Sequence, residues 1–167
     1  MIFTVGHSNH GFERFLQLLA GAEITAIADV RSKPHSRWVS QFNKPTLGAA
    51  LGENDVAYVF LGKELGGRPE DPALLKNGKP DYDAMARAKS FRDGIDRIIE
   101  GAKTHRIALM CAERDPIDCH RFLLIARHLA SRDIPVAHIL ASGEVEDQEK
   151  TEARFGARNP IGDLFGA

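Results

Sequence analysis

Both cysteines of the chain fall in one short stretch, residues 110–121, which reads MCAERDPIDCHR. An apolar, strand-like run precedes this stretch, and a helix-like run follows it. The turn between the two elements therefore holds two thiols, several carboxylates, an imidazole and guanidinium groups. Because α/β proteins bind ligands at the turn from strand to helix, this stretch is the first candidate for a functional site.

Cys119 is the strongest candidate for a nucleophile in this stretch. It is predicted at the N-terminus of a helix, and His120 and Arg121 follow it directly. A helix dipole and neighbouring cations stabilise a thiolate and lower its pKa from a reference of about 8.5. His120 or His7 would then act as its acid or base. The competing interpretation is a small buried apolar residue, and it is stronger for Cys111, at the end of a strand.

Glu113 and Arg121 add a carboxylate and a cation to the same turn. Glu113, or alternatively Asp29, would orient the reacting groups or relay a proton. Arg121 in a first helical turn is unfavourable for the helix dipole, which indicates another role. Together with Arg31 it would clamp a phosphate or carboxylate. Local ion pairs are the alternative explanation of these charges.

The same side chains also suit a metal site. Cys111, Cys119, His120 and His7 offer two thiolates and two imidazoles, a donor set whose softness fits zinc or iron. The spacing lacks the second close pair of ligands that structural zinc sites use, and it lacks the C-x-x-C redox pair. The interval from cysteine to arginine in cysteine-dependent phosphatases is also absent. The sequence is thus consistent with nucleophilic and with metal-binding chemistry.

Five apolar, β-branched runs alternate with helix-like segments and must position these residues. Strands are predicted over residues 2–5, 24–30, 56–61, 107–110 and 135–140. Helices are predicted from Ser8 or Asn9 to Gly21 and over about 46–54, 83–103 and 120–132, with a long connection at 62–81. This alternation predicts a three-layer α/β/α sandwich with a mostly parallel sheet of about five strands. Residues 1–142 would form one α/β domain, and residues 143–167 a charged, loosely ordered C-terminal tail.

If the strands are parallel, their carboxyl ends meet at one edge of the sheet. Reactive side chains follow four of the strands: His7 and Ser8, Asp29 and Arg31, Lys63 and Glu64, and Cys111 and Glu113. Loops and helix N-termini gather at such an edge, so one shared site is predicted there. Ser36 lies in a loop that can approach a substrate.

Composition sets broad limits on function. The formal net charge of the 167 residues is −1, which gives no reason to expect polyanion binding by bulk electrostatics. No apolar run approaches the ~20 residues of a membrane span, and no signal-peptide pattern is present. Two cysteines do not make a disulfide framework, so we expect a cytoplasmic protein without a membrane partner. A locally basic loop with interleaved aromatics fits nucleic acid, although a solvated surface is its usual explanation; it contains Arg31, Lys33, His35, Arg37, Trp38, Phe42 and Lys44.

Four separated motifs occur in order along the chain: Thr4-Val5-Gly6-His7-Ser8, Asp29-Val30-Arg31 with Pro34 and Ser36, Leu61-Gly62 to Gly66-Gly67, and Cys111-Ala112-Glu113 to Cys119-His120-Arg121. Together they resemble the family called domain of unknown function 488, from the first residues to about Leu140. The resemblance implies an enzyme-like site without naming a reaction. Its matching positions are His7, Ser8, Asp29, Arg31, Ser36, Cys111, Glu113, Cys119, His120 and Arg121.

The leading prediction is a small enzyme with thiolate-based chemistry, acting on a small anionic or nucleotide-like molecule. The catalytic residues would be Cys119, His120, Cys111, Glu113 and His7. The substrate-binding residues would be Arg121, Arg31, Asp29, Ser8 and Ser36. A metal-binding protein and a nucleic-acid-processing or binding factor are the alternatives.

Overall fold

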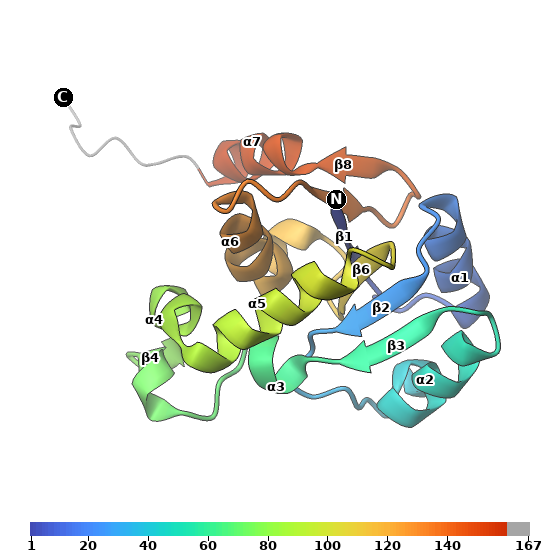
Figure 1. Ribbon diagram of the computed structural model, residues 1–167, viewed down its shortest axis with the longest axis horizontal. Coiled ribbons are helices and arrows are strands. Elements are labelled where there is room, and N and C mark those ends of the chain that lie inside the picture. Colours follow the sequence, from blue (N-terminus) through green and yellow to red (C-terminus); the bar gives the residue numbers. More distant parts are fainter. Residues whose placement is uncertain (160–167) are drawn as a thin grey trace.

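A computed structural model describes residues 1–159 as an α/β protein with a six-stranded central sheet (Figure 1). The strands of this sheet are β1 (Ile2–Gly6), β2 (Ala26–Asp29), β3 (Ala57–Phe60), β6 (Ile107–Cys111), β7 (Val136–Ile139) and β8 (Val145–Asp147). Their order is β3-β2-β6-β1-β7-β8, and all neighbours are parallel except β7 and β8. Helices lie on both faces of the sheet, so the predicted three-layer α/β/α sandwich is confirmed.

The helices connect the strands as the alternating pattern predicted. They are α1 (Phe12–Gly21), α2 (Lys44–Gly52), α3 (Gly62–Leu65), α4 (Tyr82–Arg87), α5 (Lys89–Gly101), α6 (Arg127–Ala130) and α7 (Gln148–Arg158). A π-helical segment, Arg121–Ala126, runs directly into α6. Short 3-10 turns cover Ser40–Phe42, Pro72–Leu74 and Pro116–Asp118.

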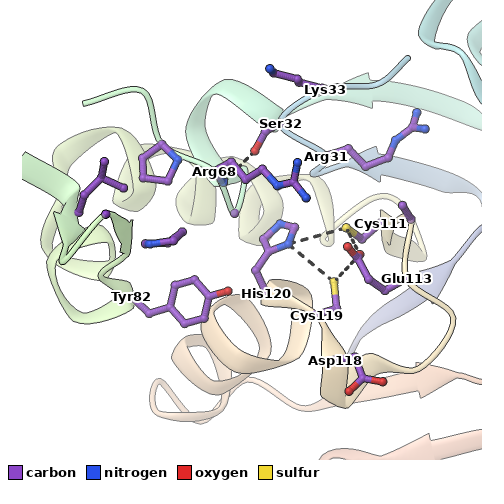
Figure 2. A pocket seen from close by; sticks show the side chains of 16 residues that line it. Arg31, Ser32, Lys33, Arg68, Tyr82, Cys111, Glu113, Asp118, Cys119 and His120 are labelled. Carbon is purple, nitrogen blue, oxygen red and sulfur yellow. Dashed lines mark hydrogen bonds between the residues drawn. The ribbon is translucent and has the colours of Figure 1, made fainter. Parts of the chain in front are cut away.

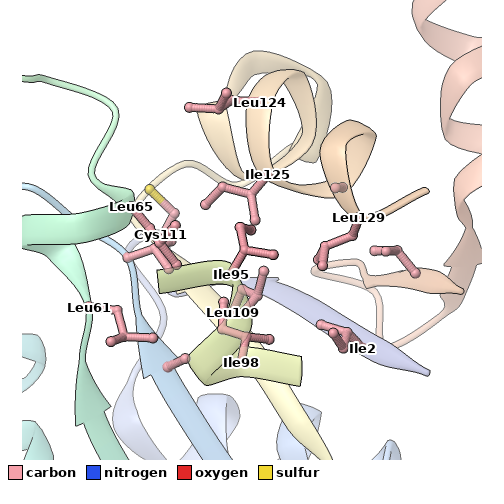
Figure 3. Packing of buried hydrophobic residues seen from close by; sticks show 14 of the residues in the cluster. Ile2, Leu61, Leu65, Ile95, Ile98, Leu109, Cys111, Leu124, Ile125 and Leu129 are labelled. Atoms are coloured by element: carbon pink, nitrogen blue, oxygen red, sulfur yellow. The ribbon is translucent and has the colours of Figure 1, made fainter. Parts of the chain in front are cut away.

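The central strands are buried on both faces because a helical layer covers each side. On one face, Leu109 packs with Ile95 of α5 and Ile125 of the π-helical segment (Figure 3). On the other face, Phe15 of α1 and Leu47 of α2 belong to a second hydrophobic cluster. Side chains alternate along β6, so Cys111 lies on the same face as Leu109. This alternation directs the first cysteine toward the layer that carries the second.

Two predicted segments differ in detail. The apolar periodicity over 83–103 predicted one helix, but the backbone of Ala88 is extended, with ψ 141°, and separates α4 from α5. The long connection 62–81 contains α3, a 3-10 turn and a small hairpin of β4 (Leu75–Lys76) and β5 (Lys79–Pro80). Asn77 and Gly78 turn this hairpin with positive φ at both positions, as a two-residue type I′ turn requires.

The charged segment from residue 143, predicted to be a tail, forms β8 and α7 as far as residue 158. β8 adds to the edge of the sheet beside β7. The charges of α7 form ion pairs with the domain: Arg127 with Glu152, and Arg154 with Asp115. Only residues 160–167 of the predicted tail lie outside the described residues. Among residues 1–159, every helix is too short or too polar to cross a bilayer.

Candidate functional site

Cys111, Cys119 and His120 form a compact cluster at the carboxyl end of β6 (Figure 2). The Nδ1 atom of His120 lies 3.7 Å from the sulfur of Cys111 and 3.7 Å from the sulfur of Cys119. All three donor atoms lie within 4.8 Å of one another, and both cysteines are free. All three residues are buried. Two sulfurs and one imidazole nitrogen converging in this way can hold a metal ion.

A backbone carbonyl fixes the orientation of the His120 ring. Nε2 of His120 lies 3.0 Å from the carbonyl oxygen of Val30, which follows β2. Because a carbonyl oxygen only accepts hydrogen bonds, Nε2 carries a proton. In the neutral ring, Nδ1 then bears a lone pair toward the two sulfurs, whereas a protonated ring donates from Nδ1. Burial lowers the pKa of His120, but the hydrogen bond with Cys119 and its charge, together with the hydrogen bond to Val30, leave this pKa above its ordinary value. Gly67 packs against the same ring, where a Cβ atom would lie 2.6 Å from Cγ of His120.

Glu113 completes the cluster from the loop after β6. Its Oε2 atom accepts hydrogen bonds from the thiols of Cys111, at 2.9 Å, and Cys119, at 3.1 Å. Burial raises the pKa of the Glu113 carboxyl group, but these two hydrogen bonds, a backbone hydrogen bond and the charge of His120 together leave the pKa below its ordinary value. Glu113 is therefore an ionised acceptor that faces both sulfurs.

The two thiols have opposite acid–base tendencies. The hydrogen bond with Cys119, followed by burial, raises the pKa of Cys111 well above its ordinary value. Burial also raises the pKa of Cys119, but hydrogen bonds with Cys111 and His120 and the charge of Arg121 lower it to about 6. The backbone N–H of Arg121 also donates to the Cys119 sulfur at 3.4 Å. Cys119 is thus the more acidic member of the pair. The protonated thiol of Cys119 donates to Glu113, and the thiolate accepts from Cys111 and His120 instead.

Cys119 stands at the start of the helical run that leads into α6. The backbone N–H groups of Phe122 and Leu123 both donate to its carbonyl oxygen at 3.0 Å. The first six residues of this run, Arg121–Ala126, are π-helical. Such segments are rare and occur frequently at functional sites. The sequence predicted a helix here, but its periodicity did not reveal the π geometry.

A cavity of about 660 Å³ opens onto this cluster (Figure 2). Cys111, Cys119, His120 and Glu113 are all among the residues that line it. The remaining wall comes mainly from the loop after β2 and from the long connection 62–81: Arg31, Ser32, Lys33, Gly67, Arg68, Pro69, Leu75, Gly78 and Pro80, with Tyr82 of α4. The volume is within the usual range for small-molecule sites.

Two cations on the cavity wall lack a carboxylate partner. Within residues 1–159, neither Lys33 nor Arg68 forms a salt bridge. The backbone N–H of Arg68 donates to Ser32 Oγ at 2.9 Å, which joins the long connection to the loop after β2. Both side chains are exposed. Unpaired cations beside a cavity favour an anionic ligand.

Asp29, Arg31 and His7 form a separate buried network next to the cavity. Arg31 donates two hydrogen bonds to the Asp29 carboxylate, at 2.8 and 2.6 Å, and one to the carbonyl oxygen of Phe42 at 2.8 Å. Nδ1 of His7 lies 2.7 Å from the carbonyl oxygen of Ser8, so Nε2 accepts from Arg31 at 3.2 Å. Burial, with the charge of Arg31, lowers the pKa of His7 to about 4. Both ring nitrogens of His7 are engaged, and His7 lies outside the cysteine cluster.

The other predicted substrate-binding residues do not line the cavity. The guanidinium of Arg121 is fully buried and donates to the carbonyl oxygens of Glu113 and Arg114. Ser8 bonds Asn9, and Ser36 accepts from backbone N–H groups in its own loop. In the predicted basic loop, Trp38 is 81% exposed and the Arg37 guanidinium stacks on its ring.

Tyr82 lines the cavity but was not among the residues predicted at the site. Tyr82 begins α4 directly after the long connection, and Asp81 caps that helix by accepting from Ala84 N–H at 3.0 Å. The unusual length of the connection was the available signal, because loops longer than about 12–15 residues are often functional. Nothing in the local sequence fixed where that loop would pack.

The fold and the cluster define an α/β protein with a cysteine–histidine site at the carboxyl edge of its parallel sheet. The chain matches the family model described as Domain of unknown function DUF488 over residues 11–128 and belongs to that family. The predicted resemblance is therefore confirmed. Searches of curated proteins and of solved structures found no match.

Proposed function

We propose that this protein is an enzyme that acts on a small anionic molecule bound in the 660 Å³ cavity. One observation carries the proposal: Cys119, His120 and Glu113 lie together on the wall of a cavity that unpaired cations also line. A structural cluster would gain nothing from facing a cavity of substrate size. Buried reactive groups that converge on such a cavity are typical of active sites.

The composition of the wall supports the anionic character of the substrate. Lys33 and Arg68 contribute unpaired positive charge from two different segments of residues 1–159. Arg31 is neutralised by its ion pair with Asp29, and the Asp118 carboxylate on the same wall is paired with Arg158. Tyr82, Pro69 and Leu75 contribute apolar surface on the same cavity. A molecule with a carboxylate or phosphate at one end and a compact apolar body would match both parts of the wall.

Substrate class is tested first by binding. The purified protein is heated in the presence of individual phosphate monoesters and carboxylates, and the unfolding temperature is recorded for each. A bound anion raises this temperature, because it stabilises only the folded state. Lys33→Glu and Arg68→Glu should abolish the rise. Lys150→Glu, an exposed lysine of α7 that lies outside the cavity, is the matched control and should retain it.

Chemistry is then tested on the anions that bind. Each is incubated with the wild-type protein and with Cys119→Ser, and products are followed by mass spectrometry. The proposal is supported if the wild type converts an anion and Cys119→Ser does not, while the circular dichroism spectra of the two proteins agree. Cys119 would then be at the reactive centre of an enzyme. Equal turnover by both proteins, or wild-type protein that neither binds nor converts any anion, contradicts the proposal.

A further inference from the structure

We propose that Cys111, Cys119 and His120 bind a divalent transition metal ion, zinc by preference, with a fourth coordination position open to the cavity. Glu113 is then the base for a water molecule bound at that position. This inference assigns the chemistry of the proposed active site and in that respect rests on the proposed function. The metal site itself stands on its own geometry.

The sulfur–nitrogen separations are close to those of a tetrahedral zinc site. Zinc–sulfur bonds of about 2.3 Å and zinc–nitrogen bonds of about 2.0 Å at tetrahedral angles place sulfur about 3.5 Å from nitrogen. Both sulfur–Nδ1 separations at His120 are 3.7 Å, so neither cysteine is closer to the ring than the other. Both separations are thus within about 0.2 Å of the tetrahedral sulfur–nitrogen distance, and the three donor atoms all lie within 4.8 Å of one another.

The tautomer of His120 favours metal binding. Nε2–H donates to the carbonyl oxygen of Val30 at 3.0 Å, so in the neutral ring the Nδ1 lone pair lies where the two sulfurs converge. Metal-ligating histidines almost always donate their other N–H to a carbonyl or carboxylate, which fixes the ring and raises its basicity. The backbone N–H of Arg121, 3.4 Å from the Cys119 sulfur, adds an outer hydrogen bond to a thiolate ligand.

The position of Glu113 is that of a residue beside the metal site and not of a metal ligand. Its Oε2 atom lies 2.9 and 3.1 Å from the sulfurs, closer than two ligands of one zinc ion, which are about 3.5 Å apart. These are hydrogen bonds from the thiols. Metal binding requires both thiols to lose their protons, and the Glu113 carboxylate then loses both donors. A metal-bound water molecule supplies the replacement donor.

The number of protein ligands indicates whether a zinc site is structural or catalytic. Structural zinc sites have four protein ligands, whereas catalytic sites have three ligands and a water molecule. Here three ligands converge and the cavity lies beside them. Zinc lowers the pKa of its bound water to about 7, which allows a carboxylate to accept the proton.

The reaction class that follows is hydrolysis. Glu113 takes one proton from the bound water, and the resulting hydroxide attacks an electrophilic carbon or phosphorus atom of the substrate. The bond from that atom to the leaving group breaks, and the leaving group departs with the bonding electron pair and the proton from Glu113. One water molecule is consumed, and no electrons are exchanged with a second reactant.

Cobalt(II) provides a readout that does not depend on activity. Reduced, metal-stripped protein is titrated with Co²⁺ without oxygen. The expected result is one equivalent bound, with a sulfur-to-cobalt charge-transfer band and the visible bands of tetrahedral cobalt, both removed by Zn²⁺. Protein purified from zinc-supplemented culture should contain one zinc per chain.

Zinc binding by variants distinguishes the residues that ligate the metal from the residues that only lie beside it. Cys119→Ser and His120→Gln should weaken zinc binding more than about 100-fold, because even outer-sphere changes cost 10–100-fold. Glu113→Gln should retain one equivalent and lose hydrolysis. His128→Gln changes a histidine of α6 outside the cluster and should leave zinc binding unchanged. If a ligand variant does not fold, the wild-type cobalt spectrum still decides the question.

The inference is overturned if the reduced wild-type protein binds neither Co²⁺ nor Zn²⁺, or if bound cobalt shows no charge-transfer band from sulfur. In that case, anion binding that depends on Lys33 and Arg68 would still support the proposed function, with a thiolate nucleophile. Conversely, stoichiometric zinc in a protein that binds no anion supports the metal site and contradicts the proposed substrate class. The two failures are therefore distinct.

Discussion

The guanidinium of Arg121 donates a 2.6 Å hydrogen bond to the backbone carbonyl oxygen of Glu113. It also donates to the carbonyl oxygen of Arg114 at 3.2 Å, and its side chain is fully buried. The sequence predicted Arg121 as an anion clamp. In the structure it instead holds the loop that carries Glu113, and thereby positions the carboxylate beside the two sulfurs.

Arg121→Lys is expected to reduce the free energy of unfolding by about 2–3 kcal/mol, because a single ammonium cannot reproduce the guanidinium fork and charged hydrogen bonds contribute about 1.5–3 kcal/mol each. Urea unfolding measures this loss. The control is Arg132→Lys, whose exposed ion pair with Asp96 should change stability by less than about 1 kcal/mol. Equal losses in the two variants would show that Arg121 has no special role in holding the loop.

Gly6, the last residue of β1, is expected to be irreplaceable. A Cβ atom there would lie 1.9 Å from the carbonyl oxygen of Glu113, which is backbone and cannot rotate away. Gly6→Ala should therefore displace the loop after β6 and lower both stability and Co²⁺ affinity. Gly11→Ala is the matched control, because a Cβ atom at Gly11 meets nothing within 4 Å. A Gly6→Ala protein with wild-type stability and metal affinity would refute this packing argument.

The Asp29–Arg31 ion pair is expected to be essential to stability. Both residues are buried, and Asp29→Ala would leave the Arg31 guanidinium without its partner, at a cost of about 3–5 kcal/mol. Tyr58 also donates to Asp29, at 2.7 Å, but from an edge strand, so Tyr58→Phe should cost about 1 kcal/mol. Denaturant unfolding of the two variants gives the comparison. If Asp29→Ala reduces the free energy of unfolding by less than Tyr58→Phe does, the ion pair is not essential to stability.

Acid is expected to destabilise the protein partly through His138. Nδ1 of His138 contacts Thr4 Oγ1, and Nε2 contacts Gln148 Oε1, both at 2.8 Å. Burial lowers the pKa of His138 from 6.5 to about 4, and the charge of Arg121 acts in the same direction while Glu146 opposes it. Because the unfolded chain binds the proton more readily, stability is lost as pH falls from about 6.5 toward 4, by up to about 3 kcal/mol.

The measurement is the free energy of unfolding of the wild type and of His138→Gln at pH 7 and at pH 4.5. Glutamine does not titrate, so the variant should lose less stability between these two pH values, whatever its stability at pH 7. His7, whose pKa is also lowered to about 4, contributes equally to both proteins and cancels in the comparison. The same loss in both proteins would exclude a contribution from His138.

The sequence alone determined the fold class and much of the cluster. Alternating apolar strands and amphipathic helices specify a parallel sheet with two helical layers, because each element must bury its apolar side. The strand-to-helix turn also brought Cys111, Glu113, Cys119 and His120 into one local unit, since all four fall within the ten residues 111–120. Short-range geometry is sufficient for such a unit.

Tertiary structure decided what surrounds the cluster. The carbonyl of Val30, directly after β2, orients His120, and the connection that carries Gly67 and Arg68 forms part of the cavity wall. The tertiary structure also showed that Arg31 is paired with Asp29 and that Arg121 is buried, although both arginines were predicted to bind an anion. These outcomes depend on contacts between residues distant in sequence, which periodicity and local spacing do not encode. Strand-end position indicated which residues gather at the edge, but packing determined which of them face the cavity.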